Sequence, residues 1–433
     1  MRDILITIVF VAVAIPALTR PWLGVMLWAW LDYMSPHILC YGFAARIPWV
    51  QLAAAVTLIG FVCTRESIRF PVTAETTLLL IFSLWITFTT LLALNPGETW
   101  DAWGKAIKIQ VFIVAVLCAI RTPERIQSLI WVIAASIGYY GVRGGIGSVL
   151  SGGVNRVYGP DNTYIADNND LALALVTILP MLRFLQLRAE RRLVSHTLSC
   201  AMALTIFAVL CSYSRAGMLA LGATALLLVM KSRRKLLLAC MLGLTLTIGL
   251  SLMPPQWFDR VNSIDNYEQD ASANQRLNAW TAAWNLAKDR PIVGGGFRAF
   301  TPELYEKYAP VLDYHEAHNI FLKILAEHGF PGLALFLVLG FLTWRSASWI
   351  RRNSGDDQSS LWAADLASMM QVSLLGYAVG GSFSNLAYFD LPYNLMAIVV
   401  LTKVWLQENT SDVKTEFTDS ELLVGPSARQ CEV

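Results

Sequence analysis

The sequence predicts an all-α polytopic membrane protein, and three observations support this prediction. The chain has 433 residues, of which 55% are apolar and only 15% are charged, whereas soluble domains are about a quarter charged. The apolar residues gather in runs, many of which approach the ~20 residues needed to cross the hydrocarbon core. Lys and Arg cluster between these runs, as they do in the cytoplasmic loops of membrane proteins.

The apolar runs predict about twelve transmembrane helices. They lie near residues 3–18, 22–38, 48–63, 75–94, 105–120, 127–145, 168–186, 196–212, 216–230, 236–253, 330–349, 363–382 and 385–406. The first two are short and are broken by Pro16, Arg20 and Pro21, so they form either one kinked crossing or two tilted ones. The first run lacks a small-residue cleavage site and more spans follow, so we expect it to stay in the membrane.

The basic clusters assign a side of the membrane to each loop. Three arginines from 188 to 192 precede the run 196–212, and a basic cluster at 231–235 follows the run 216–230. Both clusters are expected inside the cell, which places the turn 212–215 and the long polar segment 254–317 outside. The chain then divides into a transmembrane bundle (1–253), an external loop with the catalytic segment (254–329), three C-terminal spans (330–406) and a disordered cytoplasmic tail (407–433).

The external loop is expected to contain short helices. Apolar residues recur at spacings of three and four between Asn274 and Asp289, and Pro291 ends that pattern. A second short helix is expected over 299–309, with Glu303 and Lys307 paired at i,i+4. Between the two, Gly294 to Gly296 predict a bend where the backbone approaches another segment closely.

Two arginines on this outer side are candidate ligands for phosphate. Ser214 is placed to cap the helix that follows it, whose free amides favour an anion. Arg215 adds a planar fork of donors that matches phosphate, with Ser212 and Gly217 as supporting residues. Arg276 repeats this pattern in the loop helix, and Arg298 is a weaker third candidate. The alternative for Arg215 is an interfacial cation that pairs with lipid headgroups.

His318 is the candidate general base. The chain has only five histidines, and imidazole is the side chain suited to accepting a proton near neutral pH. Its alternative is a capping or hydrogen-bonded interfacial role. A metal site is a further alternative, with His315 and His318 as ligands and Glu316 nearby. No third ligand is obvious, so no metal is expected.

The remaining polar residues receive structural interpretations. His37, His196 and His328 are assigned structural roles. Asp161, Asp167 and Asp170 face the outer side and either order an acceptor or, as the favoured interpretation, cap the next helix. The seven cysteines show no CxxC spacing, so neither a disulfide framework nor a zinc site is supported. No basic stripe with interleaved aromatics indicates nucleic-acid binding.

Several of these elements together resemble the O-antigen ligase/polymerase superfamily. They are Ser212, Ser214, Arg215 and Gly217, then Arg276, then Pro291 with Gly294 and Gly296, and finally His318 and Asn319 leading to Glu327 and Gly329. They span about residues 200–335. The N-terminal part, with Gly159-Pro160-Asp161 and Asp167-Asn168-Asn169, is similar to the branch of probable O-glycosylation ligases of exosortase-associated systems.

The resemblance implies a metal-independent, inverting glycosyltransferase of the bacterial inner membrane whose active site faces the periplasm. Such enzymes take a glycan from undecaprenyl diphosphate and join it to lipid A–core oligosaccharide, with no cofactor. It also implies about twelve helices, both termini in the cytoplasm and a large periplasmic loop before the last three spans. Arg215 and Arg276 would bind the diphosphate, and His318, followed by Asn319, would take the acceptor proton.

Three other functions remain open at this stage. A repeat-unit polymerase would use the same residues with a lipid-linked glycan as acceptor, and a protein O-oligosaccharyltransferase would use a protein. The third is a transporter or flippase, which predicts charges near mid-span and inverted repeats. The spans here carry few charges, and the polar residues gather at one end.

Overall fold

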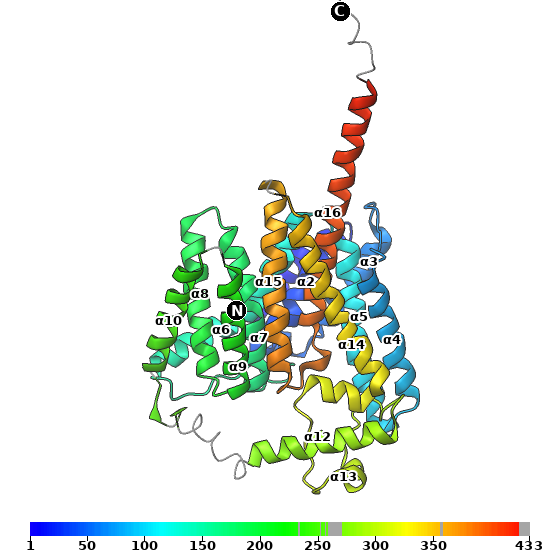
Figure 1. Cartoon of the computed structure of the whole chain (residues 1–433), viewed down its shortest axis with the longest axis vertical. Coiled ribbons are helices and arrows are strands. Elements are labelled where there is room, and N and C mark those ends of the chain that lie inside the picture. Colours follow the sequence, from blue (N-terminus) through cyan, green and yellow to red (C-terminus); the bar gives the residue numbers. More distant parts are fainter. Residues whose placement is uncertain (233, 252, 256, 259–270, 356–357, 424–433) are drawn as a thin grey trace, which may run out of the picture.

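The chain folds into a bundle of helices with a small helical cap at one end (Figure 1). The computed structural model describes residues 1–423 except 233, 252, 256, 259–270 and 356–357. Within these residues there is no strand, and seven helices are long and apolar enough to cross a membrane. The all-α prediction is therefore confirmed for the part of the chain that is described.

The first two apolar runs form two separate helices, α1 (Arg2–Ala17) and α2 (Pro21–Met34). At one end of this hairpin, the Thr64 hydroxyl donates to the Thr19 carbonyl at 2.9 Å; at the other, the Ala44 amide donates to Asp3 Oδ1 at 3.0 Å. At 1.5 Å per residue these helices are about 24 Å and 21 Å long, shorter than the ~30 Å hydrocarbon core.

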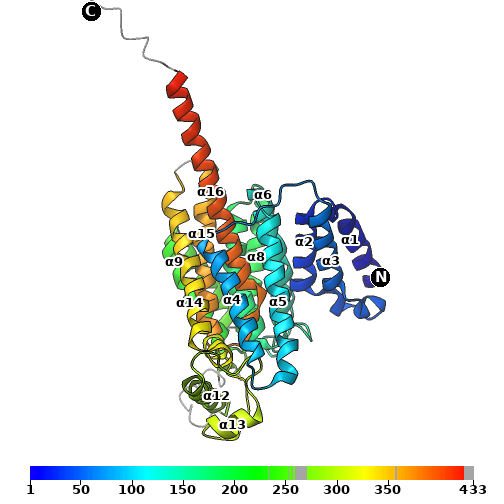
Figure 2. The same cartoon turned by 90° about the vertical axis from the view of Figure 1, so that its right-hand side faces the viewer.

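The hairpin changes the expected position of the N-terminus. The end of α2 meets the start of the last helix, where the rings of Tyr33 and Phe389 lie 6.1 Å apart, and Asp3 lies beside the loop that follows α2. Helix α1 therefore begins at its cap-facing end, about midway along the bundle, whereas the C-terminal helix projects from the end opposite the cap (Figures 1 and 2). This differs from the resemblance, which implied both termini on one side.

Eight further helices of the described residues belong to the bundle before the cap. They are α3 (Trp49–Cys63), α4 (Ala74–Leu91), α5 (Pro96–Ala119), α6 (Pro123–Leu150), α7 (Asn168–Leu187), α8 (Arg192–Leu210), α9 (Arg215–Lys231) and α10 (Lys235–Ser251). Each matches a predicted apolar run, because hydropathy marks the part of a helix that lipid or core must cover. Helix α7 is buried over most of its length between α6, α8, α9 and α15.

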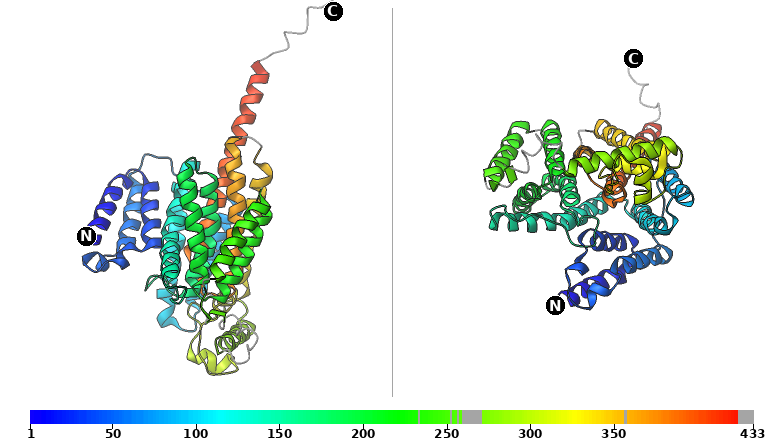
Figure 3. Two further views of the ribbon diagram at one scale, coloured as in Figure 1. Left: turned by 90° about the vertical axis from the view of Figure 1, so that its left-hand side faces the viewer. Right: turned by 90° about the horizontal axis from the view of Figure 1, so that it is seen from below.

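Two helices that follow α10 form the cap, close to the positions at which the sequence predicted short helices. Helix α12 (Ala271–Asp289) lies across the end of the bundle, and α13 (Pro302–Tyr308) packs beside it (Figures 1 and 3). Trp280 of α12 donates from Nε1 to the Ala317 carbonyl at 2.7 Å. Lys307 pairs with Asp289 at 2.9 Å, not with Glu303 as expected, because α13 lies against the end of α12.

The chain ends in α14 (Ile320–Asn353), α15 (Gln358–Gly381) and α16 (Asp390–Leu423). Helix α14 starts ten residues before the predicted run 330–349 and is kinked at Gly329, where φ is +69°. Helix α16 continues through 407–423, which the sequence predicted as disordered tail; a helix already begun extends residue by residue without a second nucleation step. Residues 424–433 lie outside the described residues.

Candidate functional site

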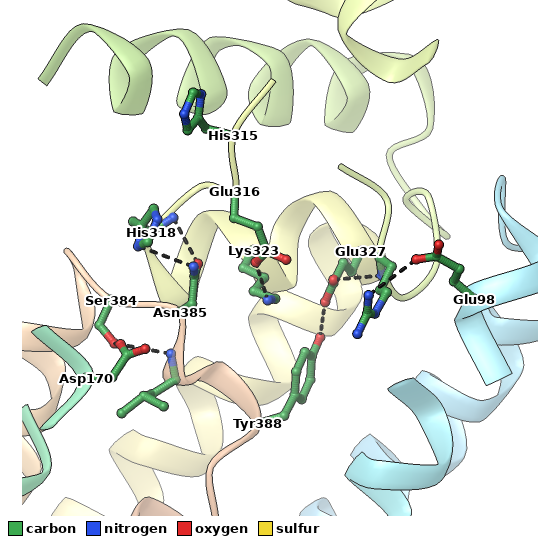
Figure 4. Close-up of polar contacts among 12 residues, drawn as sticks. Glu98, Asp170, His315, Glu316, His318, Lys323, Glu327, Ser384, Asn385 and Tyr388 are labelled. Carbon is green, nitrogen blue, oxygen red and sulfur yellow. Dashed lines mark hydrogen bonds and ion pairs between the residues drawn. The ribbon is translucent and has the colours of Figure 1, made fainter. Parts of the chain in front are cut away.

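The segments that carry the predicted site residues meet at the cap end of the bundle. They are the turn between α8 and α9, helix α12 and the start of α14, and the loop between α15 and α16 joins them there. The prediction that these segments share one end is consistent with the backbone, since Trp280 of α12 packs on Phe383 of the α15–α16 loop with ring centroids 6.4 Å apart. The polar groups at their centre are drawn in Figure 4.

The turn from α8 to α9 is built as the sequence predicts. Ser214 is the N-cap of α9, and its hydroxyl accepts from the Gly217 amide at 3.0 Å. That hydroxyl also donates to Asn169 Oδ1 at 2.7 Å, which ties the turn to the start of α7. Ser212 is fully buried and hydrogen-bonded within its own turn, so it supports the turn and does not face a ligand.

Close packing explains the glycine that follows. A Cβ added at Gly217 would lie 2.7 Å from Ala172 Cβ of α7, nearer than two carbon atoms can approach without repulsion. The first turn of α9 is thereby pressed against α7. Arg215, in the same turn, is half-buried, so a rigid backbone positions its guanidinium group.

His318 is held in place by one side chain from a distant loop. Its backbone N–H donates to Asn385 Oδ1 at 3.0 Å, and Asn385 Nδ2 lies 3.2 Å from its ring Nδ1 (Figure 4). An amide nitrogen can only donate, so Nδ1 accepts and the neutral ring carries its proton on Nε2. His318 has φ of +43°, a conformation that costs energy for a non-glycine residue and that this paired contact stabilises.

Charges around His318 favour its neutral form. Burial and the nearby Arg276 guanidinium lower the pKa of His318 below its ordinary value of 6.5, although Glu316 and Asp167 oppose them. The two predicted residues, Arg276 and His318, are therefore close enough to interact electrostatically. A neutral imidazole has one lone pair that can accept a proton; here it is on Nδ1, to which Asn385 donates.

An ion pair lies beside this histidine. Lys323 Nζ is 2.6 Å from Glu316 Oε2, and burial, which raises the pKa of Glu316, is outweighed by the Lys323 ammonium, which lowers it. The lysine side chain is only 14% exposed. Its charge is held one helical turn from the start of α14, so it adds to the positive field around His318.

The Glu327 side chain stabilises the kink of α14 through two hydrogen bonds. Its Oε1 accepts from the Arg298 amide at 3.0 Å, and its Oε2 accepts from the Tyr388 hydroxyl at 2.7 Å (Figure 4). The Gly296 amide donates to the Glu327 carbonyl at 2.8 Å. A Cβ at Gly329 would lie 2.3 Å from the Ile292 carbonyl oxygen, so the predicted close approach of the glycine bend is to the kinked backbone of α14.

The other predicted residues have structural partners. Arg298 forms an exposed ion pair with Glu98 at 3.3 Å, which lowers its value as a phosphate ligand. Asn319 caps α14, accepting from the amides of Phe321 and Leu322. Asp167 caps α7, as favoured, and Asp170 instead accepts from Ser384 at 2.6 Å. No group of three or more His, Cys, Asp or Glu side chains suited to a metal exists among the described residues.

Sequence reasoning missed Asn385, Lys323 and Tyr388. Asn385 is 67 positions from His318, and nothing in the local pattern joins them. Lys323 had a detectable signal: it is a charged residue seven positions after Glu316, at the start of an otherwise apolar helix, and such residues are expensive unless paired.

The fold and the site together define a multi-pass membrane protein with a polar, positively charged site at one end of its bundle. Residues 200–337 match a family model described as O-Antigen ligase, and residues 1–190 match one described as a family of unknown function (DUF5935). No curated protein matches the chain. The first match supports a place in the O-antigen ligase superfamily, and the likeness of the N-terminal part to exosortase-associated ligases stays a prediction.

Proposed function

We propose that the protein transfers a glycan from undecaprenyl diphosphate to a hydroxyl of lipid A–core oligosaccharide at the periplasmic face of the inner membrane. The observation that carries this proposal is His318, neutral near pH 7 and within electrostatic reach of Arg276, inside the segment that matches O-Antigen ligase. A base beside a phosphate-binding cation is what this transfer requires.

The reaction needs no nucleotide or cofactor, because a sugar on diphosphate is already activated. The acceptor oxygen forms a bond to the anomeric carbon while the bond from that carbon to the diphosphate oxygen breaks. The diphosphate leaves with the bonding electrons, and the acceptor proton passes to Nδ1 of His318, which carries the lone pair of the ring and which the Asn385 amide would release when the acceptor binds. Attack opposite the leaving group inverts the anomeric centre. General-base catalysis of this kind contributes about 10²–10⁴ in rate.

The arginines take the part that a divalent metal plays in other transferases. Arg215, on the first turn of α9, and Arg276 would bind the two phosphates and stabilise the charge that develops as they leave. His318 can also donate a hydrogen bond from Nε2–H, which Asn385 does not contact. Lys323, paired with Glu316, would hold the acceptor side of the site in place.

The test is transfer by the purified full-length protein. Detergent-purified protein should join a diphosphate-linked glycan to lipid A–core with no ion gradient. His318→Ala should abolish transfer and retain donor binding, and Arg215→Lys should lose most activity at normal expression because Lys lacks the planar fork. Turnover near that of the unchanged protein in both variants would refute the site. Inhibition by EDTA that zinc or magnesium reverses would refute the metal-free mechanism.

The same assay distinguishes the alternatives. Offering a second lipid-linked glycan in place of lipid A–core tests the polymerase, and offering periplasmic protein tests the O-oligosaccharyltransferase. We expect product with lipid A–core and little with the other two acceptors. A product that forms only with the lipid-linked glycan would reassign the protein as a polymerase.

A further inference from the structure

A cavity of about 270 Å³ lies at the end of α6, in the part of the chain that precedes the O-Antigen ligase match. Helix α6 forms one wall and the loop 155–160 forms the other. The loop is joined to the α8–α9 turn, because the Val157 amide donates to the Cys211 carbonyl at 3.1 Å. The cavity therefore opens at the cap end of the bundle, next to the turn that carries Ser214 and Arg215.

Two arginines, Arg143 and Arg156, line this cavity. Neither makes an ion pair with any residue that the structure describes. Arg156 instead lies over the ring of Tyr213, with its guanidinium carbon 5.5 Å from the ring centroid. Two guanidinium groups around one small cavity repel each other, and a bound anion would relieve that repulsion while accepting their hydrogen bonds.

Glycines on α6 keep the cavity open. A Cβ at Gly144 would lie 2.6 Å from Val157 Cγ1, so a larger residue there would displace the loop. A Cβ at Gly147 would meet nothing within 4 Å, and Gly147 lines the cavity. The space beside Gly147 is therefore not filled by any described side chain.

Exposed apolar side chains lie on the same last turns of α6, on faces of the helix that do not line the cavity. Ile146, Val149 and Leu150 on the last turns of α6 are exposed at 47%, 51% and 82%. Helix α6 has 28 residues, about 42 Å at 1.5 Å per residue, which exceeds the ~30 Å hydrocarbon core. A helix of this length placed across a membrane would extend into the headgroup layer, where its exposed apolar side chains would contact lipid and the arginines would meet phosphate.

We propose that this arginine pocket, formed by Arg143, Arg156, Gly147 and the loop 155–160, binds the phosphate-bearing headgroup of a lipid. The guanidinium groups hold the phosphate, and the apolar end of α6 contacts the acyl chains. The pocket is separate from the His318 site in its residues, and this proposal does not depend on the transfer reaction. A soluble phosphate would use the arginines but would gain nothing from the apolar end of α6.

The experiment measures binding of dioctanoyl phosphatidic acid to the purified full-length protein in a neutral detergent. Arg143→Gln/Arg156→Gln should weaken binding at least tenfold, and Gly147→Leu, whose Cβ would meet nothing within 4 Å and whose side chain would extend into the cavity, should do the same. The matched controls are Arg352→Gln, at an exposed position at the opposite end of α14, and Gly222→Leu, at a helical glycine that also has open space around its Cβ. Both should bind as the unchanged protein does.

Two further probes identify what is recognised. Dioctanoylglycerol lacks the phosphate and inorganic phosphate lacks the lipid, and each should bind at least tenfold more weakly than phosphatidic acid. Unchanged affinity in the double arginine variant and in Gly147→Leu would overturn the site. Equal binding of inorganic phosphate would overturn the lipid assignment. Since only binding is measured, loss of transfer in His318→Ala leaves this result unaffected.

Discussion

The protonation of His318 is controlled by residues from three different segments. Burial and Arg276 lower its pKa, whereas Glu316 and Asp167 raise it. If neutral His318 is the base, activity is complete well above its pKa and falls as the pH drops through that pKa, below 6.5. The acid limb of the pH–rate profile therefore reports the balance of these charges.

Arg276→Gln should move that acid limb to higher pH. Removing the guanidinium group takes away an interaction that lowers the pKa of His318, so the ring protonates earlier as the pH falls. The measurement is kcat/KM against pH for the variant and for the unchanged protein. Arg345→Gln, on the exposed surface of α14, is the control and should leave the limb in place. A limb that stays fixed in Arg276→Gln would argue against contact between Arg276 and His318.

Two asparagines near His318 should respond differently to truncation. Asn385 holds the imidazole and the backbone of His318, so Asn385→Ala should lower kcat at least tenfold with little change in thermal stability. Asn319 caps α14, so Asn319→Ala should cost about 1 kcal/mol of stability and shift the unfolding midpoint. Measuring both quantities for both variants separates positioning from capping. The reverse pattern would contradict the assignment.

For single residues, the sequence predicted structural roles better than contact partners. Ser214 as a cap, Asp167 as a cap and His328 as a structural histidine follow from local rules, and His328 is indeed buried with Nδ1 2.6 Å from Thr89 Oγ1. The sequence could not show that Arg298 is paired, because its partner Glu98 lies 200 positions away. Long-range contacts of that kind leave no periodic signal in the chain.

Among the elements, α14 combines two segments that the sequence treated separately. Hydropathy predicted the run 330–349 and placed 318–329 in the external loop, but the structure joins them across Gly329. The positive φ at Gly329 is fixed by its neighbours, since the Phe330 amide donates to the Pro291 carbonyl at 2.8 Å. A kink that tertiary contacts impose cannot be read from propensity alone.

Gly329→Ala should destabilise the protein markedly, whereas Gly340→Ala should not. Alanine at Gly329 would have φ of +69° and a Cβ 2.3 Å from the Ile292 carbonyl oxygen; the left-handed conformation alone costs about 1–2 kcal/mol. A Cβ at Gly340, on the same helix, would meet nothing within 4 Å, and alanine there favours helix by about 1 kcal/mol. Thermal unfolding in detergent compares the two variants. Equal unfolding midpoints would contradict the tight backbone packing at Gly329.

For the whole molecule, the all-helical class followed from composition, but the N-terminal hairpin did not. The sequence left 3–38 as one crossing or two, because Pro16, Arg20 and Pro21 can either kink a helix or separate two. Contacts between Thr64 and Thr19 and between Ala44 and Asp3 decide for two antiparallel helices. An additional helix reverses the side on which the chain begins.

The hairpin therefore predicts on which side of the membrane single introduced cysteines lie. They are introduced into a variant that lacks the native cysteines. Arg2→Cys and Leu312→Cys should react with a membrane-impermeant maleimide added from one side, and Asn353→Cys only from the other. Leu312 is 72% exposed near the cap, and Asn353 is exposed at the far end of α14. If Arg2→Cys reacted from the same side as Asn353→Cys, then α1 and α2 would make one crossing, and both termini would share a side as the resemblance implied.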